Sequence, residues 1–355
     1  MSMAARWDRF VYREYMPTPR GLAIFRLLFA SAFLACSVPR YQWIATFPDD
    51  FFNPPVGPTY FFFTGFPPYG FFLALDTVIV TALVYLIAGR RVTLASAVFT
   101  GAALLGNAWA YSFGKIDHDI LMVVMPAFLA AAGWSGKGRV RAWPLALFAL
   151  VVSLAMFSAA LAKATSGWLD PHARQTFIFA LRNAIGISGR ESAAWRFGIT
   201  TMPASAWKAL DYATLLLEGS FVIAMFRRTT FRVACAVASL FHLGVLLMMK
   251  IKFLANIYAY SAFVQWDDVA ARCGVAGVVA TLQRWLARRS DLQLLVTSIA
   301  MTALVILEPH RGIAQIGTTA LMWIAAAIGI AYLASFALAW LAPVGRSSVE
   351  TPDTV

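Results

Sequence analysis

Charged residues are scarce in this sequence, and their scarcity excludes a water-soluble globular body. They make up 13% of the 355 residues, whereas 60% of the residues are hydrophobic. Soluble domains carry roughly 25% charged residues, so this chain has too little polar surface to cover an apolar core in water. The apolar residues fall in blocks of about 17–25, the length that crosses a hydrocarbon layer as a helix. Because backbone groups in lipid must bond within their own segment, we predict an all-α polytopic membrane protein.

Cysteine is also rare, which argues against a disulfide framework and a zinc site. The three cysteines, Cys36, Cys235 and Cys273, have neither CxxC spacing nor neighbouring histidines. We therefore expect no bound metal. The sequence also lacks a P-loop, a GxGxxG fingerprint, an HExxH motif and a Ser-His-Asp set, so the common soluble enzyme classes give no lead.

The net charge of +12 does not indicate nucleic-acid binding, because of where the positive residues stand. Lysine and arginine form short clusters between the apolar blocks, as the positive-inside rule describes. An N-terminus inside the cell makes four clusters cytoplasmic, at Arg90/Arg91, Lys137–Arg141, Arg227–Arg232 and Arg288/Arg289. Both termini are then cytoplasmic.

We expect about ten transmembrane helices, with a range of eight to ten. They run at about 21–37, 70–88, 94–113, 120–134, 143–162, 209–226, 233–249, 253–264, 292–307 and 316–341. The segment at 253–264 is short, and the sequence leaves its crossing open. We expect a single membrane domain at 20–345, after a cytoplasmic or interfacial arm at 1–19 and before a disordered tail at 346–355.

Three polar or aromatic connections fall together on the outer side in this topology. The first, at 39–69, is rich in proline and aromatic rings and is expected to pack on the bundle or lie in the headgroup layer. The second is the turn at 115–119. The third, at 163–208, mixes arginines with apolar residues, which predicts short amphipathic helices on the membrane face.

Ionisable side chains inside apolar segments are functional candidates, because they are costly in lipid. Arg26, Asp76, Glu218 and His242 stand within predicted crossings. They are also explained by structural pairing, such as Arg26 with Asp76 or with Glu218, and the sequence leaves both explanations open. Asp211 lies nearer a helix end, so we expect it to be interfacial.

Polar residues near two predicted helix ends are further candidates. Lys115, Asp117, His118 and Asp119 form a tight polar turn, where an aspartate at a helix N-terminus is favourable in itself. Lys163 ends a predicted crossing, where a lysine can snorkel to the interface. If Lys163 were instead desolvated, its amine would lose charge more easily and could act as a general base.

Five short segments form an ordered set of motifs between about residues 20 and 270. They are Ala23-Ile24-Phe25-Arg26-Leu27-Leu28-Phe29, Lys115-Ile116-Asp117-His118, Ala159-Ala160-Leu161-Ala162-Lys163 with Trp168, Phe241-His242-Leu243, and Ile257-Tyr258-Ala259-Tyr260 with Gln265-Trp266. In order and spacing, the set resembles the vitamin K-dependent gamma-glutamyl carboxylases and their bacterial relatives, the HTTM (horizontally transferred transmembrane) domain proteins. The resemblance implies a bacterial inner-membrane location.

This resemblance implies a reaction and two catalytic residues. In the carboxylases, a lysine deprotonates vitamin K hydroquinone, oxygen adds, and the strong base formed removes a glutamate γ-proton. The carbanion takes up carbon dioxide, and the quinone leaves as its epoxide. Lys163 matches the lysine, five residues before Trp168, and His118 matches an important histidine. The implied cofactors are a reduced quinone, oxygen and carbon dioxide, and the implied substrate is a carbon acid or peptide.

Two hypotheses of different classes follow. The first is a quinone-dependent lyase with Lys163 as base and His118 as its hydrogen-bonding partner. The second is a non-enzymatic membrane protein, in transport, export, immunity or assembly, whose intramembrane polar residues form a structural network. The carboxylases carry a large soluble region after their helices. Here two more apolar segments follow and the sequence ends at Val355, so the resemblance favours quinone chemistry over carboxylation of protein glutamate.

Overall fold

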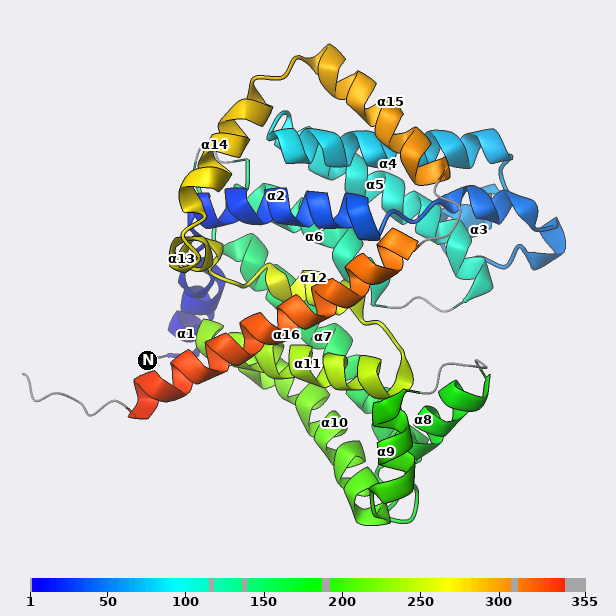
Figure 1. The fold of residues 1–355 in the computed structure, drawn as a ribbon, viewed down its shortest axis with the longest axis vertical. Coiled ribbons are helices and arrows are strands. Elements are labelled where there is room, and N and C mark those ends of the chain that lie inside the picture. The colour runs from blue at the N-terminus through cyan, green and yellow to red at the C-terminus, as the bar shows by residue number, and fades with distance from the viewer. Residues whose placement is uncertain (1, 115–117, 136–138, 187–191, 308–311, 342–355) are drawn as a thin grey trace, which may run out of the picture.

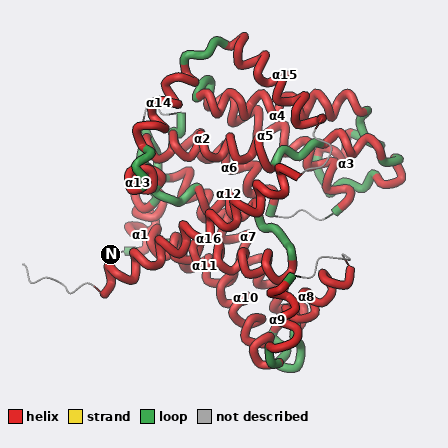
Figure 2. Tube along the Cα trace, in the orientation of Figure 1, coloured by secondary structure: helices red, strands yellow, loops and turns green. Residues whose placement is uncertain are grey.

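The computed structural model describes residues 2–114, 118–135, 139–186, 192–307 and 312–341. Within these ranges every regular element is a helix (Figures 1 and 2). The prediction of an all-α chain is therefore confirmed for the described residues. The predicted tail at 346–355 lies outside them.

The bundle is built of long apolar helices, six of which, within the described residues, are long and apolar enough to cross a membrane. They are α2 (Pro19–Cys36) continued by η2 (Tyr41–Thr46), α4 (Tyr69–Ala88), α5 (Val92–Ala110) continued by η4 (Tyr111–Phe113), α7 (Trp143–Lys163) continued by η5 (Ala164–Trp168), α11 (Arg228–Met249) and α16 (Gly312–Leu341). These helices identify the chain as an integral membrane protein.

The described helices do not support all ten predicted crossings by length and composition. α6 (Asp119–Ala132) has 14 residues, or about 21 Å of helix, less than the roughly 30 Å hydrocarbon layer. α12 (Leu254–Ser261) has only 8 residues. α15 (Asp291–Leu307) meets α14 (Ala276–Ala287) at an angle of 105°, and the two would make a seventh crossing only as one broken span.

α10 (Ala204–Ala224) carries more charged side chains than any of the six long apolar helices. It has 21 residues, which is long enough to cross, but it carries Lys208, Asp211 and Glu218. Its polar character comes from these three side chains, which all turn inward and are buried. The sequence therefore predicted a long helix here, but it did not predict the residues that compensate its buried charges.

Short helices gather at the two ends of the bundle (Figure 1). The N-terminus, α1, α13 and α14 lie toward one end, whereas α3, α8 and α9 lie toward the other. The loops predicted to share the outer side, 39–69 and 163–208, do lie toward the same end. The bounds are α1 (Met3–Arg9), η1 (Phe10–Glu14), η3 (Asp49–Phe51), α3 (Pro58–Phe62), α8 (Gln175–Gly186), α9 (Ala193–Thr201) and α13 (Trp266–Arg272).

Aromatic rings pack the loop at 39–69 against the bundle. This is one of the two arrangements that the sequence predicts for it, the other being a position in the headgroup layer. Phe113, at the end of η4, lies 4.9 Å from Trp43, 4.7 Å from Phe47 and 5.4 Å from Phe66, measured between ring centroids. Such pairs add to the free energy of apolar burial. This aromatic cluster therefore packs the loop onto the end of α5.

The N-terminal arm is fastened to a helical hairpin far along the sequence. The Tyr15 hydroxyl donates to the Met225 carbonyl at 2.6 Å, between α10 and α11. The Arg228 backbone N–H donates to Glu14, and its guanidinium donates to the Met16 carbonyl, both at 2.9 Å. Burial raises the pKa of the Tyr15 phenol, so it remains a hydrogen-bond donor.

The arrangement of the ends predicts a sided labelling pattern. In a Cys36→Ser background, a membrane-impermeant maleimide should label His172→Cys in intact cells, because His172 is exposed in the outer connection. The native Cys273 is exposed near α13 and should be labelled only after permeabilisation. Equal labelling of both thiols in intact cells would contradict this topology.

Candidate functional site

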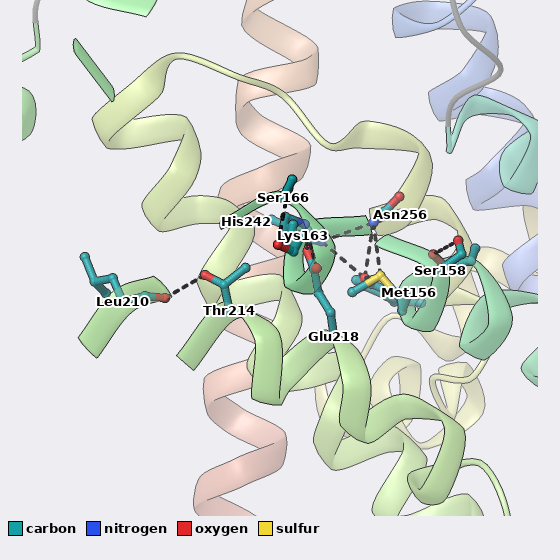
Figure 3. A network of polar contacts seen from close by, with 11 residues as sticks. Met156, Ser158, Lys163, Ser166, Leu210, Thr214, Glu218, His242 and Asn256 are labelled. Atoms are coloured by element: carbon teal, nitrogen blue, oxygen red, sulfur yellow. Dashed lines mark hydrogen bonds and ion pairs between the residues drawn. The ribbon is translucent and has the colours of Figure 1, made fainter. Parts of the chain in front are cut away.

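Lys163 and Glu218 form an ion pair inside the bundle (Figure 3). The Lys163 Nζ lies 2.6 Å from one carboxylate oxygen of Glu218 and 2.5 Å from the other. The side chains are 26% and 8% exposed. Because both oxygens hold the same ammonium, the geometry is that of a tight charge-assisted pair. Lys163 thus turns inward and does not snorkel to the interface.

Local backbone structure explains why Lys163 can make this contact. The α-helical part of α7 ends at Lys163, and the chain continues as the wider turn η5. Within η5, Gly167 has φ +88°, in the left-handed region that favours glycine. The turn places Trp168 so that the Lys163 Nζ lies 5.6 Å from its ring centroid, within reach of a cation–π interaction.

A second polar group, centred on His242, lies beside this pair. The His242 Nε2 is 3.2 Å from the Tyr260 hydroxyl and 3.2 Å from the Asn256 Nδ2. The Asn256 Nδ2 also donates to the Tyr260 hydroxyl at 3.3 Å. All three side chains are buried. Two of their buried atoms, His242 Nδ1 and Asn256 Oδ1, have no hydrogen-bond partner among the described residues, which leaves them available to a ligand or a proton.

Electrostatic contacts join these two groups and bring in His118. Lys163 and His118 lie close enough to His242, and Glu218 close enough to Tyr260, for electrostatic interaction. Phe253 stacks on His242 at 4.5 Å and lies 6.4 Å from the His118 ring, measured between centroids. We call Lys163, Glu218, His242, Asn256, Tyr260 and His118 the polar cluster.

Two candidates of the sequence cannot be placed in this cluster, and two lie elsewhere. Lys115 and Asp117 are outside the described residues. The Arg26 Nη1 donates to the Trp134 carbonyl at 2.9 Å, away from Glu218. Asp76 accepts the N–H groups of Tyr41 at 2.9 Å and Gln42 at 3.3 Å. The predicted pairing of Arg26 with Asp76 or Glu218 is therefore wrong, because Arg26 and Asp76 both bind backbone groups instead.

Asp211, which the sequence predicts to lie at the interface, is fully buried within the protein. It accepts the backbone N–H groups of Gln175 and Thr176 at 3.0 and 2.8 Å, at the start of α8. Lys208 donates to Asp211 at 3.3 Å and to the Trp168 carbonyl at 2.6 Å. This pair fixes the turn that follows Lys163, so its role is to position the site.

Sequence reasoning missed Asn256 as a site residue. Asn256 and Tyr260 stand four residues apart, so they share one face of α12. An asparagine in an apolar segment, with a tyrosine one turn later, was the signal available in the sequence. Tyr260 itself appeared only as part of a motif.

A large apolar cavity of about 620 Å³ adjoins the polar cluster. It lies among α2, α11, α12 and α16, and Tyr260 is one of its lining residues. Phe25, Phe29 and Ile328 contribute to its apolar wall. Its volume is within the roughly 300–1,000 Å³ of small-molecule sites. Tyr260 thus links the cavity to the polar cluster, because its hydroxyl lies 3.2 Å from the His242 Nε2.

No protein-family model, curated protein sequence or solved structure matches this chain.

The ion pair predicts a marked coupling in unfolding experiments. Lys163→Met or Glu218→Met alone should lower the free energy of unfolding by about 3 kcal/mol, because each leaves a charge buried without its partner. The double variant should lose clearly less than the sum of the two single losses. An SDS unfolding titration of the purified protein measures all three.

Lys250→Asn is a suitable control for this cycle, because Lys250 is an exposed lysine at the end of α11. It should leave the unfolding midpoint unchanged. Additive losses from Lys163→Met and Glu218→Met would show that the two side chains do not interact energetically.

Proposed function

We propose that this chain is a membrane enzyme in which Lys163 acts as a base toward a reduced quinone, with Glu218 as its proton partner. The observation that carries the proposal is the Lys163–Glu218 pair, with Nζ–oxygen distances of 2.5 and 2.6 Å. Buried ionisable pairs beside a cavity are frequent sites of acid–base chemistry. The pair, rather than the lysine alone, is the reactive unit.

The pair provides the two protonation states that a base needs. As an ammonium, Lys163 is held by both oxygens of Glu218. Transfer of one proton to the carboxylate leaves a neutral amine, which can accept a proton from an acidic hydroxyl. His242 and Tyr260 continue the network from the pair toward the cavity, so a released proton has neighbouring groups to receive it.

The residues around the cavity fit a quinone-sized ligand. Its walls include Phe25 and Phe29, which suit an apolar ring or tail, and its polar lining residues include Tyr260 and Arg232. Asn256 and His242 do not line the cavity, but they contact the Tyr260 hydroxyl and so connect the cavity to the polar cluster. When bound, a reduced quinone would supply an acidic hydroxyl and, with oxygen, the strong base of carboxylase-type chemistry.

The resemblance to the HTTM and gamma-glutamyl carboxylase proteins is part of this proposal. Lys163, His118, His242 and Tyr260 come from four separate motifs of the resemblance and belong to one cluster. This convergence supports the proposal, because nothing in their spacing along the chain requires it. The substrate that would receive carbon dioxide is an unidentified carbon acid or peptide.

A non-enzymatic membrane protein is the second candidate function. It is favoured by the behaviour of Asp76 and Asp211, whose carboxylates bind backbone N–H groups and so act as structural caps. In that case Lys163 and Glu218 would serve only to join α7 to α10. Catalysis by the folded protein distinguishes the two candidates.

We also propose the full set of ten crossings, in the bacterial inner membrane and with both termini cytoplasmic. α12 supports this, because it begins beside His118 and ends beside Arg232, which bonds to the Phe263 carbonyl at 2.6 Å. These contacts at the two ends of the segment support a crossing at 253–264. α10 packs lengthwise on α7, which supports its passage as well.

The enzyme proposal predicts quinone epoxide formation by purified protein in nanodiscs. Wild type, given a reduced naphthoquinone, oxygen, bicarbonate and a glutamyl peptide, should form epoxide that chromatography detects. Lys163→Ala should lower the rate by about 100-fold or more, because the general base is lost. Epoxide formation that is equal in wild type and Lys163→Ala would rule out Lys163 as the base.

Lys163→Arg separates chemistry from structure. An arginine keeps the charge that pairs with Glu218, but it does not lose its proton at working pH. The variant should unfold like wild type and yet form no epoxide, whereas Lys250→Asn should remain fully active. A stable Lys163→Arg protein that forms epoxide at the wild-type rate would show that Lys163 is not the base and that the pair is structural.

A further inference from the structure

Arg26 is a buried arginine without a carboxylate partner in the described part of the chain. Its side chain donates once, to the Trp134 carbonyl at 2.9 Å, and its buried Nε has no hydrogen-bond partner there. The residue is only 5% exposed. A charged side chain that is buried away from water is costly unless an opposite charge compensates it. Arg26 therefore calls for an anion that the described residues do not supply.

A cavity opens beside the Arg26 guanidinium. It has a volume of about 450 Å³ and lies between α2, the end of α4 and α14. Arg284 also lines it, as do small side chains such as Ala23 and Ala88. Gly89, with φ +69°, keeps the space open, since a Cβ there would lie 2.6 Å from the Arg26 Nη2. Two guanidinium groups thus line one cavity.

α14, which covers this cavity, has the form of a helix lying in the membrane surface. Val278, Leu282 and Trp285 recur at helical spacing and are exposed by 69%, 42% and 53%. Gln283, on the other face, donates to the Ala23 carbonyl at 2.9 Å and so ties α14 to α2. An exposed apolar stripe on an amphipathic helix enters the boundary between headgroups and acyl chains. The cavity therefore lies at headgroup depth.

We propose that this cavity binds the phosphate group of a membrane phospholipid through Arg26 and Arg284. Guanidinium groups bind phosphate oxygens through paired N–H donors. Basic pockets between helices at the positive side of a membrane bind anionic headgroups. The stripe on α14 gives the acyl chains an apolar surface next to the cavity, which a free phosphate would not use. The occupant compensates the buried charge of Arg26.

Native mass spectrometry of the full-length protein tests this site. After mild delipidation and titration with phosphatidylglycerol in detergent, wild type should retain one tightly bound lipid. Arg284→Gln should weaken that binding by on the order of tenfold, since it removes one charge-assisted contact. Because Arg284 is exposed, this variant should fold normally. Arg26→Gln should weaken binding at least as much.

Arg288→Gln is the matched control, because it removes the same charge from an exposed residue just beyond α14 that does not line the cavity. It should bind phosphatidylglycerol like wild type. Equal binding by wild type, Arg284→Gln and Arg288→Gln would overturn the proposal. Inorganic phosphate alone could also raise the thermal stability of the protein as much as the lipid does, with the effect lost in Arg284→Gln. That result would assign the cavity to a free phosphate and overturn the lipid assignment.

Discussion

The need to compensate every buried charge governs this structure. Its helices cross a medium in which an unpaired ionisable group is costly, and its buried carboxylates each find a local solution. Glu218 binds Lys163, Asp76 binds backbone N–H groups of η2, and Asp211 binds those at the start of α8. Among the described residues, Arg26 has only a carbonyl partner. The buried charged residues therefore differ in the chemical type of their partners, a difference that their positions in the sequence do not show.

This difference separates positioning from chemistry. A carboxylate that caps a helix has its oxygens occupied by fixed backbone donors and contributes mainly to the arrangement of segments. A carboxylate that faces an amine can exchange a proton with it. Both oxygens of Glu218 face the Lys163 amine, whereas Asp211 meets Lys208 with one oxygen and also accepts two backbone N–H groups. The polar cluster is thus distinguished by the partner of its carboxylate, not by burial alone.

Much of the fold and part of the site could be predicted from the sequence. Apolar blocks gave the helical class and most helix positions, because hydrocarbon thickness constrains segment length directly. The cost of charge in lipid singled out Glu218 and His242, and the ordered motifs singled out Lys163 and His118. Pairing could not be predicted, since Lys163 and Glu218 are 55 residues apart and meet only when α7 packs on α10. The sequence showed that 253–264 is short, but not that only Leu254–Ser261 is helical there, because hydropathy does not show where a helix begins or ends.

The attachment of the N-terminal arm constrains the order of assembly. Tyr15 leaves the ribosome well before its acceptor, the Met225 carbonyl, which is 210 residues farther along. Until that carbonyl and Arg228 have been synthesised, the arm has no docking place, although α2 directly behind it can already be in the membrane. The arm must therefore wait in the aqueous or interfacial phase while several helices are inserted. Its docking therefore requires the end of α10 and the start of α11, and it can precede the synthesis of α12 to α16.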